Sequence, residues 1–123
     1  KNDLANKRNL KKDIKAACGD LAGECLIARD LVPGIDRKKM TDIFFDIADL
    51  QYVSIDNVSF SFDKTEKSFD SRHEYKKARA KYYKTAYKKL NDDFKKGVDD
   101  IIARMNSSLG EQQKAANKAR AEK

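Results

Sequence analysis

The sequence lacks tryptophan, has one proline and one histidine, and contains no long apolar run. A helix that spans a membrane needs about 20 apolar residues in succession, and a signal peptide needs an apolar core of about 7–15 residues. We find neither pattern, so we expect no transmembrane segment. The single histidine, His73, is not followed by a second histidine at helical spacing, because Lys77 occupies that position. The sequence therefore does not predict a helical zinc site.

Other catalytic patterns are missing as well. The five glycines match neither a phosphate-binding loop nor a dinucleotide fingerprint, and there is no nucleophile elbow of the Gly-x-Ser-x-Gly type. Asp42, Asp46 and Asp49 recur at helical spacing. A row of carboxylates along one helix does not wrap a cation as calcium sites do. We therefore predict that the protein is not an enzyme and that it has no cofactor and no metal.

The two cysteines, Cys18 and Cys25, are seven residues apart. On one helix their Cα atoms would lie about 10 Å apart, whereas a disulfide needs about 7 Å or less. We therefore expect two free thiols, which are typical of a reducing compartment and favour the cytoplasm. The chain begins at Lys1 rather than at methionine, which leaves a cleaved leader open.

Two amphipathic patterns in the first half of the chain predict helices over residues 2–32 and 36–51. Pro33 and Gly34 separate them. Asp36 is the expected N-cap of the second helix, since its side chain can accept a hydrogen bond from a free backbone N–H of the first turn.

A third and longer helix is expected over residues 71–109. Ser71 and Glu74 form a capping box at its start, and Gly110 can end it. Short connections favour antiparallel neighbours. The predicted fold class is therefore mainly all-α, an antiparallel bundle of three long helices that run up, down and up.

The first predicted helix contains a stretch of small residues that includes Gly19 and Gly23. Each glycine destabilises a helix by about 1 kcal/mol relative to alanine. We expect close approach of a neighbouring element to compensate, or else a bend near Gly19.

The segment between the second and third helices is ambiguous. Over residues 52–62, Val53, Ile55, Val58 and Phe60 flank Asp56 and Asn57 in a pattern that favours a short β-hairpin. Continuation of the helix and an irregular loop are the alternatives. The predicted insert is therefore a short hairpin or an irregular segment that lies on the helices.

The chain is predicted to form a single helical-bundle domain over residues 1–110. Residues 111–123 are rich in Ala, Lys, Gln and Glu and contain no large apolar residue. We expect this charged tail to be frayed or disordered, because it has nothing to bury against a core.

Positive charge is concentrated in the third predicted helix. The chain has a net charge of +7, and residues 72–89 hold eight Lys or Arg against the single acidic residue Glu74. Clustered lysines supply sequence-independent affinity for phosphates, while a solvated outer face of a helix has the same composition. The sequence leaves both interpretations open. The candidates for contact with nucleic acid or another polyanion are Lys76, Lys77, Arg79, Lys81, Lys84, Lys88 and Lys89.

Four of the five tyrosines lie in the same basic segment. Because the third helix is longer than the other two, one end is expected to project and to expose Tyr75, Arg79 and Tyr82. Tyr and Arg are enriched in protein–protein contacts. We therefore predict a non-catalytic helical interaction module or subunit that binds another protein or a second copy of itself as a homodimer. Binding of nucleic acid is the alternative function. If residues 52–69 cover the three side chains, these belong to the core instead.

Overall fold

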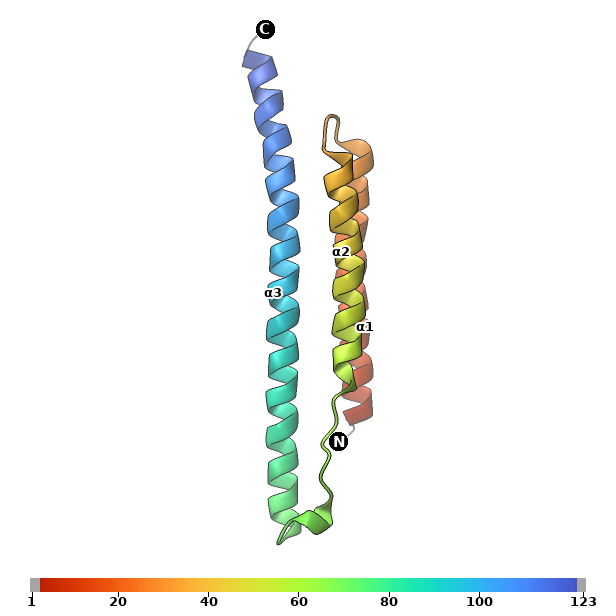
Figure 1. Ribbon diagram of the computed structural model, residues 1–123, viewed down its shortest axis with the longest axis vertical. Helices are drawn as coiled ribbons and strands as arrows, with labels where there is room; N and C mark the ends of the chain where they lie inside the picture. Colours follow the sequence, from red (N-terminus) through yellow and green to blue (C-terminus); the bar gives the residue numbers. More distant parts are fainter. Residues whose placement is uncertain (1–2, 122–123) are drawn as a thin grey trace.

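The structure, a computed structural model, describes residues 3–121 and the side chains of residues 6–110. Three helices, α1 (Asp3–Leu31), α2 (Arg37–Asp56) and α3 (Arg72–Ala121), run up, down and up (Figure 1). Two short 3₁₀ turns, η1 (Asn57–Ser59) and η2 (Glu66–Ser68), lie between α2 and α3. The predicted all-α bundle of three antiparallel helices is confirmed, and the described residues include no strand.

The predicted helix starts are confirmed by their caps. The backbone N–H of Lys39 donates a hydrogen bond of 3.0 Å to the carboxylate of Asp36. At the start of α3, the N–H of Glu74 donates to the Ser71 hydroxyl at 3.1 Å. The turn between α1 and α2 contains Gly34, whose φ of 78° lies in the left-handed region. Residues with a Cβ atom rarely adopt this conformation, whereas glycine does so readily. Local sequence therefore determines where α2 and α3 begin.

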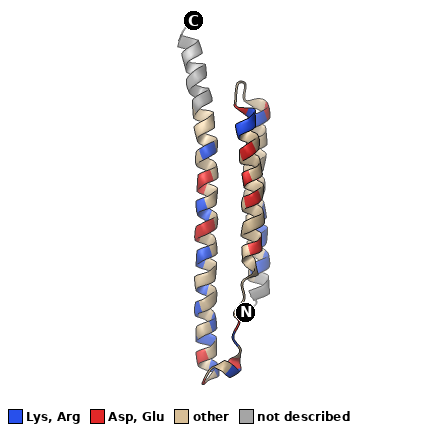
Figure 2. Cartoon of the chain, in the orientation of Figure 1, with Lys and Arg blue, Asp and Glu red and all other residues tan. Residues whose placement is uncertain are grey.

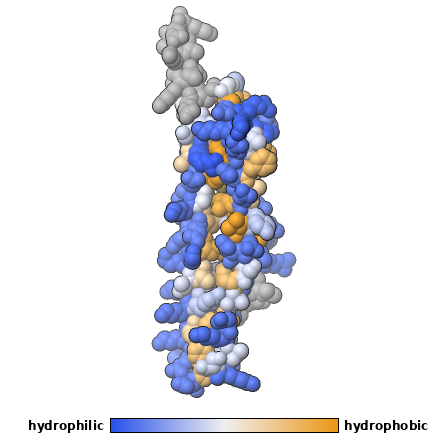
Figure 3. Space-filling model, in the orientation of Figure 1, coloured by the Kyte–Doolittle hydropathy of each residue, from blue (hydrophilic) through white to orange (hydrophobic). Residues whose placement is uncertain are grey.

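The core is centred on α2. Both α1 and α3 pack against this helix and contact each other little. Its Met40, Ile43 and Ile47 are fully buried. Leu90 and Ile101 of α3 are also buried, as the helical pattern predicts, and Phe94 packs partly against the core. Figure 3 shows hydrophobic side chains along the seam between α2 and α3, with hydrophilic side chains on either side. Because α1 and α3 each pack chiefly on α2, much of the face between α1 and α3 stays open.

The hairpin prediction for residues 52–62 is wrong. The first five of these residues continue α2 to Asp56, and η1 follows directly. Continuing the helix buries Ser54 and places Val58 of η1 in the core with no exposed surface. A helix satisfies its backbone hydrogen bonds within the segment, whereas an isolated two-stranded hairpin is only marginally stable. The rest of the insert is irregular apart from η2, which agrees with the other half of the prediction.

The small residues of α1 do not mark a close helix contact. A Cβ atom added at Gly19 or Gly23 would meet nothing within 4 Å, and α1 is helical through both positions. The close approach occurs instead at Gly97 of α3, where an added Cβ would lie 2.6 Å from a methyl group of Leu50 on α2. Gly97 therefore lets α3 approach α2 closely, a role that its sequence context did not reveal.

The third helix is longer than predicted. It continues through Gly110 to Ala121 and has 50 residues, which corresponds to about 75 Å. A glycine that ends a helix commonly adopts positive φ, and the described part of the chain has a positive φ only at Gly34. The expectation of a frayed or disordered tail over residues 111–123 stays a prediction, because the side chains of that segment and its last two residues lie outside the described part.

Candidate interaction surfaces

The insert between α2 and α3 lays three phenylalanines against the tyrosines of α3. The ring of Phe60 is centred 4.9 Å from that of Tyr87 and 6.1 Å from that of Tyr83. The ring of Phe62 is centred 5.5 Å from that of Tyr82. These distances fit edge-to-face and tilted aromatic pairs. We call the seven rings the aromatic cluster: Phe60, Phe62, Phe69, Tyr75, Tyr82, Tyr83 and Tyr87.

Polar contacts fasten this cluster to the rest of the bundle. The ammonium group of Lys7 on α1 donates a hydrogen bond to the carbonyl of Phe60. The same ammonium lies over the rings of Phe60 and Tyr83, 5.1 and 5.8 Å from their centres. The backbone N–H of Phe62 donates to the Tyr83 hydroxyl at 3.4 Å. The insert is therefore held by both α1 and α3.

Of the predicted protein-contact residues, Tyr75 and Tyr82 pack against this insert, whereas Arg79 contacts Tyr83 of α3. All three are half-buried. Tyr75 packs against Phe62 and Phe69, with ring centres 6.0 and 5.7 Å apart. The guanidinium of Arg79 lies 4.9 Å from the centre of the Tyr83 ring. Tyr75 and Tyr82 thus bind the insert, while Arg79 packs on a tyrosine of its own helix, so the three side chains are already engaged within the chain.

The predicted phosphate-contact lysines are all exposed, but two of them are paired. Lys88 contacts Asp92 at 2.7 Å and Lys89 contacts Asp93 at 2.8 Å. These hydrogen bonds raise the pKa of both lysines. Four others have no ion-pair partner within residues 6–110: Lys76, Lys77, Lys81 and Lys84.

The aspartates that recur along α2 form ion pairs with residues other than the lysines at the start of α3. Asp42 contacts Lys38 on its own helix at 3.1 Å, and Asp46 contacts Arg104 of α3 at 2.8 Å. The Asp46–Arg104 contact joins α2 to the second half of α3, whereas the predicted phosphate-contact lysines lie in its first half. Asp46 therefore helps to align the two helices.

Charge is segregated along the length of the molecule (Figure 2). One end consists of residues 6–15 and 60–89, which hold 15 Lys or Arg and five Asp or Glu. The rest of the bundle, residues 16–56 and 90–110, holds seven Lys or Arg and 12 Asp or Glu. We call these the basic end and the acidic half. Folding creates this segregation, because it places the start of α1, the insert and the start of α3 together (Figure 1).

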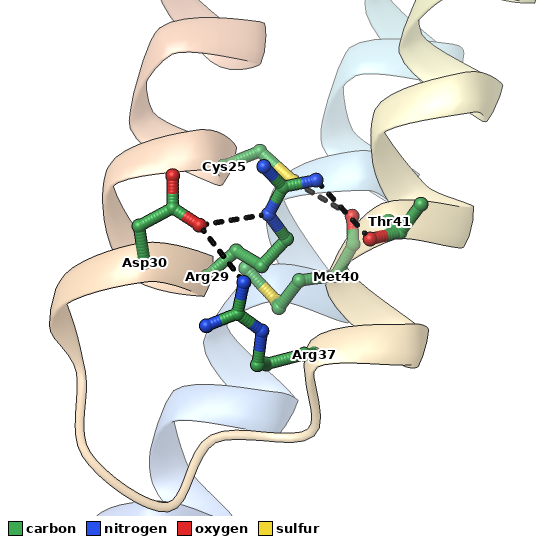
Figure 4. Close-up of polar contacts among 6 residues, drawn as sticks. All are labelled: Cys25, Arg29, Asp30, Arg37, Met40 and Thr41. Carbon is green, nitrogen blue, oxygen red and sulfur yellow. Dashed lines mark hydrogen bonds and ion pairs between the residues drawn. The ribbon is translucent and has the colours of Figure 1, made fainter.

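Polar contacts fix the turn between α1 and α2 (Figure 4). The guanidinium of Arg29 donates to Asp30 at 3.0 Å and to the Thr41 hydroxyl at 3.4 Å. The hydrogen bond from Arg29 lowers the pKa of Asp30. Next to them, the Cys25 thiol donates to the carbonyl of Met40 at 3.0 Å.

Neither cysteine is an activated nucleophile. Both Cys18 and Cys25 are free, as predicted, and both are buried. Burial raises the pKa of both thiols, and for Cys25 the nearby Arg29 only partly opposes the effect. A reactive cysteine needs a lowered pKa and solvent access. The two thiols therefore act as small apolar side chains of the core.

An apolar groove runs between the second half of α1 and the second half of α3. It has a volume of about 350 Å³. Ile27 of α1 is 60% exposed and Ile102 of α3 is 40% exposed, and Leu31 projects one turn beyond Ile27. The groove is lined by Glu24, Ile27, Ala28, Val32, Ile102, Met105, Asn106 and Leu109.

Sequence reasoning missed this groove. Ile27 and Ile102 lie beside the apolar stripes of their helices rather than on them, and only the separation of α1 from α3 leaves them uncovered. The signal that could have found them is local: Ile27 and Leu31 repeat at four-residue spacing on a face that the first helix does not need for its core.

No protein-family model, curated protein or solved structure matches this chain. Among the described residues, no helix is long and apolar enough to cross a membrane. Within the same residues, no three His, Cys, Asp or Glu side chains gather as a metal site would require. Two features described above remain as candidate interaction surfaces: the apolar groove and the exposed lysines at the basic end.

Proposed function

We propose that this protein is a non-catalytic helical interaction module that binds a helix of another protein in the groove between α1 and α3. The observation that carries the proposal is the groove itself, with Ile27 and Ile102 exposed on its two walls. Contiguous apolar surface with polar surroundings is typical of docking sites for proteins. The interaction surface still involves α3, but it lies in the second half of that helix and not at Tyr75, Arg79 and Tyr82.

The shape of the groove favours a helix as the occupant. Its walls are two helices that run in the same direction (Figure 1). A helix laid between two others buries its apolar face at positions i, i+3, i+4 and i+7. With an added helix, the chain would complete the packing of a four-helix bundle. Such an occupant would cover Ile27, Ile102 and Leu109 together.

Selection from a displayed library of helical peptides tests the proposal. We expect selected peptides to carry an apolar stripe and to lose about tenfold or more in affinity when Ile27 and Ile102 are both changed to serine, since burial of an isoleucine contributes about 1.5–3 kcal/mol. Phe45→Ser is the matched control, because Phe45 is also 60% exposed but lies on α2 outside the groove. Peptides that bind the Ile27→Ser/Ile102→Ser variant as well as the wild type would refute docking in the groove.

Self-association is tested separately by sedimentation equilibrium. A dimer that dissociates in the Ile27→Ser/Ile102→Ser variant would make a second copy the occupant, and a strict monomer at high concentration would exclude self-association through the groove.

A second candidate function is binding of nucleic acid or another polyanion at the basic end. Two observations favour this function. Positive charge is concentrated at the basic end of the folded chain, and this end exposes three lysines without an ion-pair partner within residues 6–110, Lys77, Lys81 and Lys84. Unpaired lysines can neutralise phosphates and release counterions. The tyrosines of α3 are engaged in the aromatic cluster, so stacking on bases contributes little to this proposal.

Charge reversal of Lys77, Lys81 and Lys84 to glutamate tests the second candidate. We expect the wild type to bind labelled duplex DNA with a log–log salt slope of about −2.7, as for three phosphate contacts, and the variant to lose binding while its helical circular dichroism is kept. Reversal of Lys38, Lys95 and Lys96, which are exposed in the acidic half, is the control for net charge. Equal affinity of the Lys77/Lys81/Lys84 variant and the wild type would eliminate this function.

A further inference from the structure

We propose that the helix bound by the groove is basic: an amphipathic helix with an apolar stripe flanked by Lys or Arg. This inference rests on the proposed function and adds the charge of the partner. It follows from the acidic residues that border the groove and from the lack of a suitable segment in this chain.

The two walls of the groove carry the same pattern. On α1, the carboxylate of Glu24 precedes the exposed Ile27 by three residues, and Asp20 lies one turn before Glu24. On α3, Asp99 precedes the exposed Ile102 by three residues. Residues three or four apart share one face of a helix, so carboxylates stand beside the apolar side chains on both walls.

Most of this negative charge is available to a partner. Asp20 and Glu24 are exposed and have no ion-pair partner within residues 6–110. Asp99 contacts only Lys95, at 3.5 Å and at the surface, where such pairs contribute little. The acidic half as a whole holds 12 acidic and seven basic residues. A basic helix would thus find complementary charge on both sides of its apolar stripe.

A second copy of this chain does not supply such a helix. Its strongly basic segment, residues 72–89, turns its aromatic side chains into the aromatic cluster and presents lysines outward. Residues 111–123 contain no large apolar residue. Two grooves placed face to face would bring their carboxylates together, and like charges across an interface destabilise it. The charge pattern therefore favours a different protein as the source of the helix.

Two designed helical peptides test the inference. They share one apolar stripe and one tryptophan and differ only in their flanks, which are lysine in one peptide and glutamate in the other. Because this protein has no tryptophan, the peptide fluorescence reports binding without background. We expect the lysine peptide to bind at least tenfold more tightly at low salt, and the difference to shrink as salt is added.

Charge reversal on α1 provides the decisive variant. Asp20→Lys with Glu24→Lys should lower the affinity for the lysine peptide by about tenfold or more and raise it for the glutamate peptide. The matched control is Asp49→Lys with Asp56→Lys, which changes net charge equally at two exposed positions of α2 away from the groove. Circular dichroism verifies that each variant is folded.

The experiments distinguish a failure of this inference from a failure of the proposed function. The inference is overturned if the glutamate peptide binds as tightly as the lysine peptide, or if the control pair on α2 lowers affinity as much as the pair on α1. The proposed function survives either result as long as binding still requires Ile27 and Ile102. Peptide binding that is unchanged in the Ile27→Ser/Ile102→Ser variant overturns both. A groove-dependent homodimer overturns the inference and, in the proposed function, replaces the other protein by a second copy of this chain.

Discussion

Replacing Ile43 by alanine is expected to lower the free energy of unfolding by about 2–5 kcal/mol, because truncation of a buried isoleucine removes its burial and leaves a cavity. Ile43 has no exposed surface and lies on α2, the helix that packs against both α1 and α3. Small domains are stable by only about 5–15 kcal/mol in total. The loss is therefore a large part of the whole, and urea unfolding followed by circular dichroism measures it directly.

Ile27→Ala is the matched control for this prediction. It makes the same chemical change on a side chain that is 60% exposed, and we expect it to change the free energy of unfolding by less than about 1 kcal/mol. Equal losses for the two variants would mean that α2 is not the central helix. The control also separates the residues that hold the fold from those that line the groove.

Phe60→Ala is expected to give the second large loss, about 2–3 kcal/mol, which is somewhat below the ~3–5 kcal/mol typical of a fully buried phenylalanine. Phe60 is half-buried, but three tyrosines of the aromatic cluster, Tyr82, Tyr83 and Tyr87, pack against it. Lys7 of α1 also lies over it. Truncation should release the insert from α3 and increase the exposure of the tyrosines. Quenching of tyrosine fluorescence by an added solute measures this exposure, and quenching equal to that of the wild type would show that Phe60 does not hold the insert.

The pH dependence of stability gives an independent readout of the same variant. Burial, with a smaller contribution from the charge of Tyr83, raises the pKa of Tyr87. The Tyr87 hydroxyl is buried without a hydrogen-bond partner among the described residues. In the folded wild type, Tyr87 thus keeps its proton at pH values where the unfolded chain has lost it.

The sign of the effect follows from linkage. Above about pH 10, where an unperturbed tyrosine ionises, the unfolded chain binds fewer protons than the folded one, so stability falls as pH rises. We expect this fall to be shallower in Phe60→Ala, because the exposed Tyr87 regains a more ordinary pKa. Cys18 and Cys25 also have raised pKa values, but they are distant in sequence from the substitution and common to both proteins. The difference between the two pH profiles therefore isolates the cluster, and identical profiles would contradict the assignment.

The lysines and the tyrosines predicted as contact residues on α3 differ in how well their environment could be predicted. Exposure of Lys77, Lys81 and Lys84 follows from their spacing, because three- and four-residue steps place them on one face, opposite Leu90. The covering of Tyr75 and Tyr82 does not follow from spacing, since it depends on where the irregular chain after η1 lies. A segment without periodicity carries no information about which helix it will contact.

The sequence by itself determined the three helices, the caps at Asp36 and Ser71, the free thiols and the faces that point inward, because each follows from chemistry within one or two turns of the chain. Only the tertiary structure decided that α2 is central, that α3 approaches it at Gly97, that positive charge collects at one end and that an apolar groove stays open between α1 and α3. The physical reason is that hydrophobic burial has no direction: the pattern of one helix specifies which side must be covered, but which neighbour covers it, and what remains bare, depends on how all the elements pack together.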